Sequence, residues 1–225
     1  MCGRFTLTAS FSQIIDRFDI EKFMEEDLYA PSYNVAPSQS VLSVINDGKI
    51  NRLGHLKWGL IPSWAKDEKI GYKMINARAE TLKEKASFRQ AYMKRRCLII
   101  ADSFYEWKRH NDKSKTPMRI KLKGDHLFGM AGIWERWLSP KGEPVFSCSV
   151  ITTTPNELVK DIHDRMPVIL KPEDEKIWLD RSITDTAILD SLLKPLDKDL
   201  METYQVSSLV NSPKNNSVDL IREIC

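Results

Sequence analysis

The sequence has few of the residues that mark several specialised classes of protein. Its four cysteines show no Cys-X-X-Cys spacing and its four histidines do not cluster, so we expect neither a disulfide framework nor a structural zinc site. Nine glycines and eleven prolines are too few for a collagen-like or low-complexity chain. The longest charge-free apolar stretch, Leu127 to Trp134, has eight residues, whereas a membrane-spanning helix requires roughly 18.

The amino-terminal segment and the charge balance narrow the classes further. The first twenty residues include Arg4, Asp16 and Arg17 and contain no continuous apolar segment, so we expect no secretory signal and a cytoplasmic protein. A net charge of +3 does not establish a nucleic-acid partner, although a nearly neutral chain can still carry a basic groove. Its 225 residues, 42% of them hydrophobic, contain no repeat and no flexible linker, which predicts one domain over residues 1–225.

Capping and periodicity predict four short helices. Ser10 and Gln13 have capping-box spacing ahead of apolar residues at helical intervals, and Pro172 precedes three acids that suit a first turn. Two more helices are predicted over residues 84–94 and 188–193.

Short β-rich segments lie between these helices, at residues 41–45, 97–100, 119–122 and 145–152. Strands do not alternate regularly with long helices. We therefore expect an α+β fold with a mostly antiparallel sheet rather than a doubly wound one.

The second residue, Cys2, offers distinctive chemistry. A small second residue usually permits removal of Met1, which would leave a thiol and an α-amine on adjacent carbons. With a reference pKa of about 7.7 to 8.0, about a tenth of that amine is neutral near pH 7. The amine can act as base for a thiol attacking an acyl carbon, or can condense with an aldehyde before the thiol closes a thiazolidine. Alternatively, Cys2 is only a small buried apolar residue.

Three further segments carry reactive groups, and each also has a purely structural interpretation. Asn76 and Arg78 could hold a reacting oxygen and a phosphate, or form a capped turn with a surface ion pair. Glu106 lies among three aromatic residues, which can raise its pKa toward neutrality, or it is exposed on an edge strand. His163 is oriented by nearby acids, or Arg165 pairs with those acids instead.

Two segments suggest contacts with nucleic acid. Residues 58–64 combine tryptophans with Gly and Pro, as in a loop on which bases stack, although such loops also anchor to a core. Residues 83–96 hold six basic residues and one acid, which suits a phosphate backbone or a solvated helix.

Taken together, these segments resemble the SOS response-associated peptidase (SRAP) family, the abasic-site processing proteins that act on damaged single-stranded DNA. Motifs run in family order across nearly the whole chain. They are Met1-Cys2-Gly3-Arg4, Tyr33-Asn34-Val35-Ala36-Pro37, Trp58-Gly59-Leu60-Ile61-Pro62, Asn76-Ala77-Arg78 with Glu80-Thr81, Tyr105-Glu106-Trp107, Ala131-Gly132-Ile133-Trp134, His163-Asp164-Arg165-Met166-Pro167 and Val206-Ser207 with Val210-Asn211.

The resemblance implies a barrel-like β core flanked by short helices, and a Cys2 that forms a thiazolidine crosslink with the aldehyde of an abasic site. Asn76, Glu106 and His163 would complete the active site. Asn76 would position the sugar and the amine, and Glu106 and His163 would transfer protons. The expected partner is single-stranded DNA containing abasic sites, bound by a monomer without a cofactor. The residues expected to contact DNA are Arg4, Asn34, Pro37, Trp64, Arg78, Thr152 and Arg165.

Two positions depart from the family pattern. Ile100 and Ser103 stand where Pro and Gly are common, and a serine would alter the turn before Glu106 if a positive φ were required. Cys97, Cys148 and Cys225 match no reactive position, so the first two are predicted to be core residues and the last an incidental terminal thiol.

Two other functions fit the same residues. An amino-terminal cysteine peptidase or amidohydrolase would use the same thiol and amine, and would include self-removal of the residue before Cys2. A non-covalent module would coat single-stranded DNA with its aromatic and arginine side chains.

Overall fold

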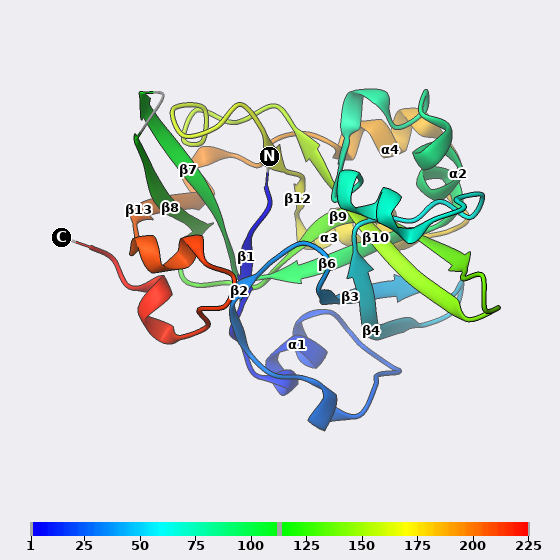
Figure 1. Cartoon of the computed structure of the whole chain (residues 1–225). Helices are drawn as coiled ribbons and strands as arrows, with labels where there is room; N and C mark the ends of the chain where they lie inside the picture. Colours follow the sequence, from blue (N-terminus) through cyan, green and yellow to red (C-terminus); the bar gives the residue numbers. More distant parts are fainter. Residues whose placement is uncertain (1, 112–113, 225) are drawn as a thin grey trace.

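The computed structural model describes residues 2–111 and 114–224, whose strands form two sheets (Figure 1). The strands are β1 (Phe5–Leu7), β2 (Ser32–Val35), β3 (Ser40–Asn46), β4 (Asn51–Trp58), β5 (Asn76–Arg78), β6 (Arg96–Ala101), β7 (Ser103–Asn111), β8 (Ser114–Leu122), β9 (Phe128–Leu138), β10 (Pro144–Thr153), β11 (Met166–Pro167), β12 (Ile169–Leu170) and β13 (Met201–Gln205). The α-helices are α1 (Phe11–Arg17), α2 (Ala86–Lys94), α3 (Pro172–Leu179) and α4 (Thr186–Leu192). Short 3-10 helices include η2 (Glu68–Lys73), η3 (Ala79–Thr81) and η5 (Ser208–Asn211).

The larger sheet closes on itself as a five-stranded barrel. Strands β4, β3, β6, β9 and β10 pair in that order with antiparallel neighbours, and β10 returns to β4 through a short parallel contact. Strand β5 runs parallel to β10 outside this ring, while β11 and β12 extend the sheet. The expected α+β class, with a mostly antiparallel barrel and short helices, is confirmed.

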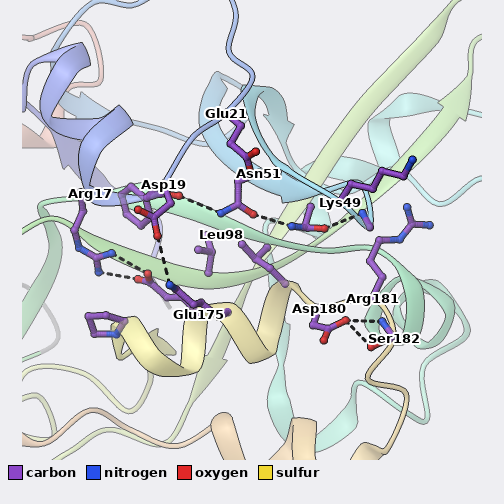
Figure 2. Close-up of a pocket in the computed structure, with 16 residues that line it drawn as sticks. Arg17, Asp19, Glu21, Lys49, Asn51, Leu98, Glu175, Asp180, Arg181 and Ser182 are labelled. Atoms are coloured by element: carbon purple, nitrogen blue, oxygen red, sulfur yellow. Dashed lines mark hydrogen bonds and ion pairs between the residues drawn. The ribbon is translucent and has the colours of Figure 1, made fainter.

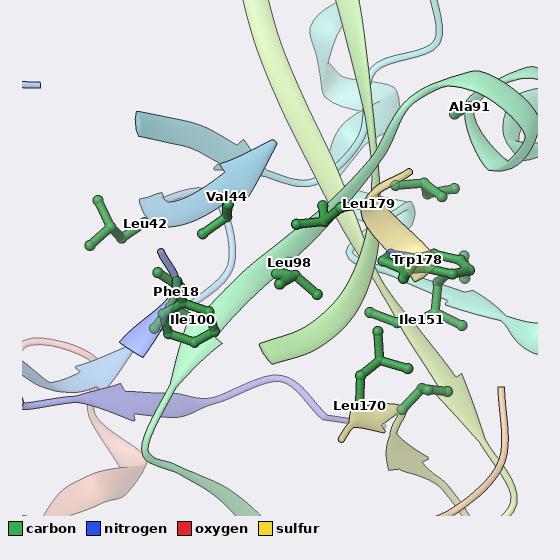
Figure 3. Close-up of a cluster of buried hydrophobic side chains, with 14 of the residues drawn as sticks. Phe18, Leu42, Val44, Ala91, Leu98, Ile100, Ile151, Leu170, Trp178 and Leu179 are labelled. Atoms are coloured by element: carbon green, nitrogen blue, oxygen red, sulfur yellow. The ribbon is translucent and has the colours of Figure 1, made fainter. Parts of the chain in front are cut away.

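Strand β6 separates two hydrophobic cores, and all six of its residues are buried. Because successive strand residues point to opposite faces, Cys97 and Ile99 join the cluster that contains Cys2, whereas Leu98 joins the cluster with Trp178 of α3. Figure 3 shows the second cluster, with Leu98 between the barrel strands and side chains of α3. Because both faces of β6 are buried, residues 97–101 are apolar without alternation.

The smaller sheet sets the path of the amino-terminal residues. Its order is β13, β8, β7, β1 and β2, so β1 lies between β2 and β7. Phe5 pairs with Phe104 in an antiparallel register, and Tyr105 N–H donates to the Arg4 carbonyl at 2.9 Å. The residues before Phe5 therefore run beside the residues after Phe104, which include Glu106.

The four predicted helices are present, with small differences at their ends. Helix α1 has both hydrogen bonds of the capping box between Ser10 and Gln13, and α3 has Pro172 in its first turn. Helix α2 begins at Ala86, two residues later than predicted, and Lys85 supplies no side-chain cap. Across the described ranges, no helix has the length and apolar character needed to cross a membrane.

The buried cysteines follow the prediction. Cys97 and Cys148 are free thiols with no exposed surface, in the core cluster they share with Cys2. Cys225 lies outside the described residues.

Candidate active site

Four side chains from distant parts of the sequence meet near the amino terminus. Cys2 precedes β1, Asn76 begins β5, Glu106 lies in β7, and His163 lies in the loop between β10 and β11. Asn76 Nδ2 donates to the Cys2 carbonyl oxygen at 2.8 Å, and His163 Nε2 lies 3.9 Å from Glu106 Oε2. The Glu106 carboxylate contributes to raising the pKa of the Cys2 thiol, after burial, which is the main cause. The structure thus brings these four predicted residues into one cluster.

Asn76 is held in place by strand pairing with β10 and by hydrogen bonds to the carbonyl of the preceding residue, Ile75. The parallel pairing of β5 with β10 sets Asn76 beside Val150, whose N–H donates to the Ile75 carbonyl at 3.0 Å. Trp58 Nε1 donates to the same carbonyl at 2.8 Å. The Asn76 Oδ1 atom is buried and has no hydrogen-bond partner within residues 2–111 and 114–224. A buried acceptor of this kind is suited to receive a hydrogen bond from an amine or a sugar hydroxyl.

Glu106 is a buried acid with a pKa near neutrality. It is 3% exposed, and the preceding Tyr105 is fully buried, with its hydroxyl donating to the Tyr33 carbonyl at 3.0 Å. Burial disfavours the carboxylate and raises the pKa of Glu106 to about 7. A group with such a pKa can both donate and accept a proton at physiological pH.

The ring of His163 is oriented by the backbone that follows it. The Arg165 N–H donates to His163 Nδ1 at 3.0 Å. Because an amide N–H cannot accept, this hydrogen bond favours the neutral tautomer that carries its proton on Nε2, on the side facing Glu106. Asp164 Oδ1 also lies 2.8 Å from Nδ1, which favours the charged ring, but that side chain is 83% exposed and solvated. Burial lowers the pKa of His163, so we take the neutral ring as the ground state.

The residues predicted to contact DNA divide into an exposed and a covered group. Trp64 is 60% exposed, Arg78 is exposed, and Pro37 is partly exposed. Arg4 Nη1 instead donates to Asn34 Oδ1 and to the Val210 carbonyl, each at 2.7 Å. Asn34 is 2% exposed and donates to three carbonyls of the segment 210–215.

Thr152 and Arg165 are buried beside the cluster. Thr152 Oγ1 has no exposed surface and no hydrogen-bond partner in the described part of the chain. The Arg165 guanidinium forms a bidentate pair with Glu80, at 2.8 and 2.9 Å. The ion pair expected in the segment 76–81 is formed by Glu80, and its partner Arg165 lies 85 positions further along the chain, too far for a local pattern to reveal.

Ser103 adopts ordinary extended geometry at the start of β7, so the substitution of the family glycine needs no positive φ. Its hydroxyl forms a short hydrogen bond with Thr6 Oγ1 and accepts from Arg119 Nε at 2.8 Å. The serine therefore cross-links β1, β7 and β8 behind Glu106.

Several basic residues of the segment 83–96 make internal contacts. Arg96 is 4% exposed and donates to several carbonyls, including that of Trp178 at 2.6 Å. Arg95 pairs with Glu135 at 2.7 Å, and Lys83 pairs with Asp190 at 2.5 Å. Half of the six basic side chains therefore have partners within the fold.

A separate polar cavity of about 670 Å³ lies between α1, the β3–β4 turn and α3 (Figure 2). Arg17 grips the buried Glu175 with two nitrogens, each at 2.9 Å, and the Gly129 N–H donates to the same carboxylate at 3.2 Å. None of the residues predicted for the site lines this cavity.

Cys2 lies near the amino terminus of the chain, close to a buried acid, Glu106, and an imidazole, His163. Together with the barrel, this arrangement is typical of a class of proteins with a candidate nucleophile at the amino terminus. Residues 1–213 match the family model described as SOS response associated peptidase (SRAP), and the chain belongs to that family.

Relatives and a solved structure agree with this placement. The chain is 65% identical over 221 residues to abasic site processing protein YoqW of Bacillus subtilis (strain 168), covering 98% of this chain and 99% of YoqW. It is 31% identical over 268 residues to abasic site processing protein HMCES of Rattus norvegicus, covering 98% of this chain and 75% of HMCES. A crystal structure of a protein from Bacteroides thetaiotaomicron superposes with a TM-score of 0.90 at 31% identity, covering 100% of both chains.

Proposed function

We propose that this chain is an abasic-site processing protein that binds single-stranded DNA and traps the lesion through Cys2 after Met1 is removed. The observation that carries this is the contact between Asn76 and the Cys2 carbonyl, which holds the terminus beside Glu106. The names of YoqW and HMCES support the choice of substrate. The protein acts as a single-domain monomer and needs no cofactor.

The reaction joins the Cys2 aminothiol to the aldehyde carbon of the ring-opened sugar. The amine attacks that carbon, and the resulting carbinolamine loses water with a proton from Glu106 to give an iminium ion. The Cys2 sulfur then adds to the iminium carbon while its proton passes to the Glu106 carboxylate, which leaves the ring nitrogen as a neutral N–H. One C–N and one C–S bond form, and one water is released. His163 Nε2–H, 3.9 Å from Glu106, assists these transfers.

The state of the Cys2 thiol favours this order of steps over a peptidase mechanism. Burial, with a smaller contribution from Glu106, raises the pKa of the thiol well above its usual range. A thiolate that attacks an amide is therefore scarce, whereas condensation of the amine with an aldehyde needs no thiolate. Sustained turnover of a peptide substrate would favour the peptidase instead.

Arg78 and Trp64 contact the DNA strand in this proposal, through a phosphate and a base respectively, and their exposure supports these roles. Arg4, Asn34, Thr152 and Arg165 are held within the fold, so they support the DNA-binding surface from below, while the partly exposed Pro37 is available to the strand. A strand that bound equally well with and without the lesion, and formed no adduct, would identify a non-covalent binding module.

Intact-mass measurement tests the proposed reaction. The purified protein is expected to lack Met1, and incubation with an abasic oligonucleotide should add the oligonucleotide mass less one water. Cys2→Ala should abolish the adduct, while Cys225→Ala, which also removes one thiol, should retain it. A stable adduct formed by Cys2→Ala would refute the role of Cys2.

A further inference from the structure

The Arg165 side chain is tied down on two sides. Arg165 Nη1 and Nη2 donate to the two carboxylate oxygens of Glu80, at 2.8 and 2.9 Å, and Nη2 also donates to the Thr152 carbonyl at 2.5 Å. Arg165 is 8% exposed, although the Glu80 side chain remains 48% exposed. A bidentate pair fixes the plane of a guanidinium as well as its position. Arg165 is therefore anchored to both η3 and β10.

The backbone of the same residue holds the His163 ring. The Arg165 N–H that donates to His163 Nδ1 belongs to the chain between His163 and β11, and Pro167 of β11 is paired with Thr152 of β10. The direction of this N–H depends on the anchored side chain on one side and on the paired strand on the other. Among the described residues, the charged or titratable side chains that act on the ring are Glu106, Asp164 and Arg109.

We propose that Glu80 is a positioning residue which acts through Arg165 to keep His163 Nε2–H directed at Glu106. This role rests on the proposed function, because it concerns the acid–base pair of that reaction. Both terminal nitrogens of Arg165 donate to Glu80, so a DNA phosphate that took the same two donors would have to displace a bidentate carboxylate. The Arg165 Nε atom is buried and has no hydrogen-bond partner among the described residues. Glu80 does not touch the reacting atoms. Its effect is on the tautomer and direction of the imidazole.

Imidazole nitrogen chemical shifts in the DNA-free protein test this directly and require no crosslinking. Wild type should show His163 as the Nε2–H tautomer. Glu80→Gln and Arg165→Lys should each raise the fraction protonated at Nδ1, because neither retains the charged bidentate pair. Glu84→Gln, which removes the same charge from an exposed side chain nearby, should leave the tautomer unchanged. Wild-type tautomer ratios in both Glu80→Gln and Arg165→Lys would overturn the assignment.

Kinetics on abasic single-stranded DNA give the second measurement. Glu80→Gln should slow single-turnover adduct formation by about tenfold with unchanged affinity for the strand, since a misdirected proton donor affects the reaction rather than binding. Tighter, more salt-dependent binding at an unchanged rate would overturn the assignment and show that Glu80 masks a phosphate site on Arg165. If wild type formed no adduct, the proposed function would fail, while the nitrogen shifts would still decide the role of Glu80.

Discussion

Glu106 and Glu175 are both buried carboxylates, 3% and 5% exposed, and their partners are of different kinds. Glu175 is held by the permanently charged guanidinium of Arg17 at 2.9 Å, at the edge of the cavity in Figure 2. Glu106 faces the titratable ring of His163 at 3.9 Å. Burial raises the pKa of both acids, and that of Glu106 reaches about 7.

The difference shows what each region is built to do. A carboxylate fixed by an arginine and a backbone N–H contributes to structure, because its charge is compensated at every physiological pH. A carboxylate beside an imidazole can gain or lose its proton during a reaction. The cavity of about 670 Å³ therefore belongs to the structural acid, and the chemistry is expected at Glu106, away from that cavity.

The largest expected effect separates the two acids by reaction rate. Glu106→Gln should slow adduct formation by about 100-fold or more with little change in DNA binding, because it removes the proton donor and acceptor. Glu175→Gln should react at close to the wild-type rate. Single-turnover assays on abasic oligonucleotides measure both. Equal losses of rate and of binding for Glu106→Gln would indicate a structural role.

The Arg17–Glu175 pair, in contrast, should matter for stability rather than for the reaction rate. Arg17→Ala leaves Glu175 buried without its cation and should lower the free energy of unfolding by about 3 to 5 kcal/mol at pH 7, measured by urea denaturation. Lys176→Ala, which removes a 79% exposed cation near Asp19, should change it by less than about 1 kcal/mol. Similar losses in the two variants would mean that the Arg17–Glu175 pair is not a structural requirement.

The pH dependence of stability should show that ionised Glu106 destabilises the fold. Its pKa is higher in the folded state, about 7, than in the unfolded state, so the fold is favoured below the unfolded value of about 4.3 and loses stability as the pH rises through 7. Glu106→Gln should remove this loss and be more stable than wild type by about 3 kcal/mol at pH 8, with no difference at pH 4. Parallel stability curves for the two proteins would contradict the raised pKa.

The smallest expected effect concerns the exposed edge of the site. Arg78→Ala should weaken binding to single-stranded DNA modestly and reduce the slope of log affinity against log salt by about 0.7. Arg222→Ala, which removes a 70% exposed arginine near the carboxyl terminus, is the matched control and should leave the slope unchanged. Identical slopes for Arg78→Ala and wild type would place the strand elsewhere.

Local features of the fold could be predicted from sequence because their determinants are close together. The Ser10–Gln13 box and Pro172 each specify a helix start within one turn, and the apolar run of β6 specifies a strand buried on both faces. Barrel closure could not be predicted in this way. The parallel contact of β10 with β4 joins Cys148 to Trp58, and no local pattern encodes a pairing across 90 positions.

The same limit applied to the site. Residue types at Cys2, Asn76, Glu106 and His163 indicated chemistry, and the family resemblance grouped them. The partners of Arg4 and Arg165 could not be predicted, because free arginines and internally paired ones look alike in a sequence. Only the structure shows Arg4 bound to the Val210 carbonyl and Arg165 bound to Glu80.

The hydrogen bond from Asn76 reaches Cys2 through its carbonyl oxygen, on the opposite side of the residue from the peptide bond that joins it to Met1. Removal of Met1 would leave this hydrogen bond unchanged. The new α-amine of Cys2 would then already lie in the site, and no further movement of the terminus would be needed. In the proposed function, removal of Met1 would therefore complete the reactive centre in a single step.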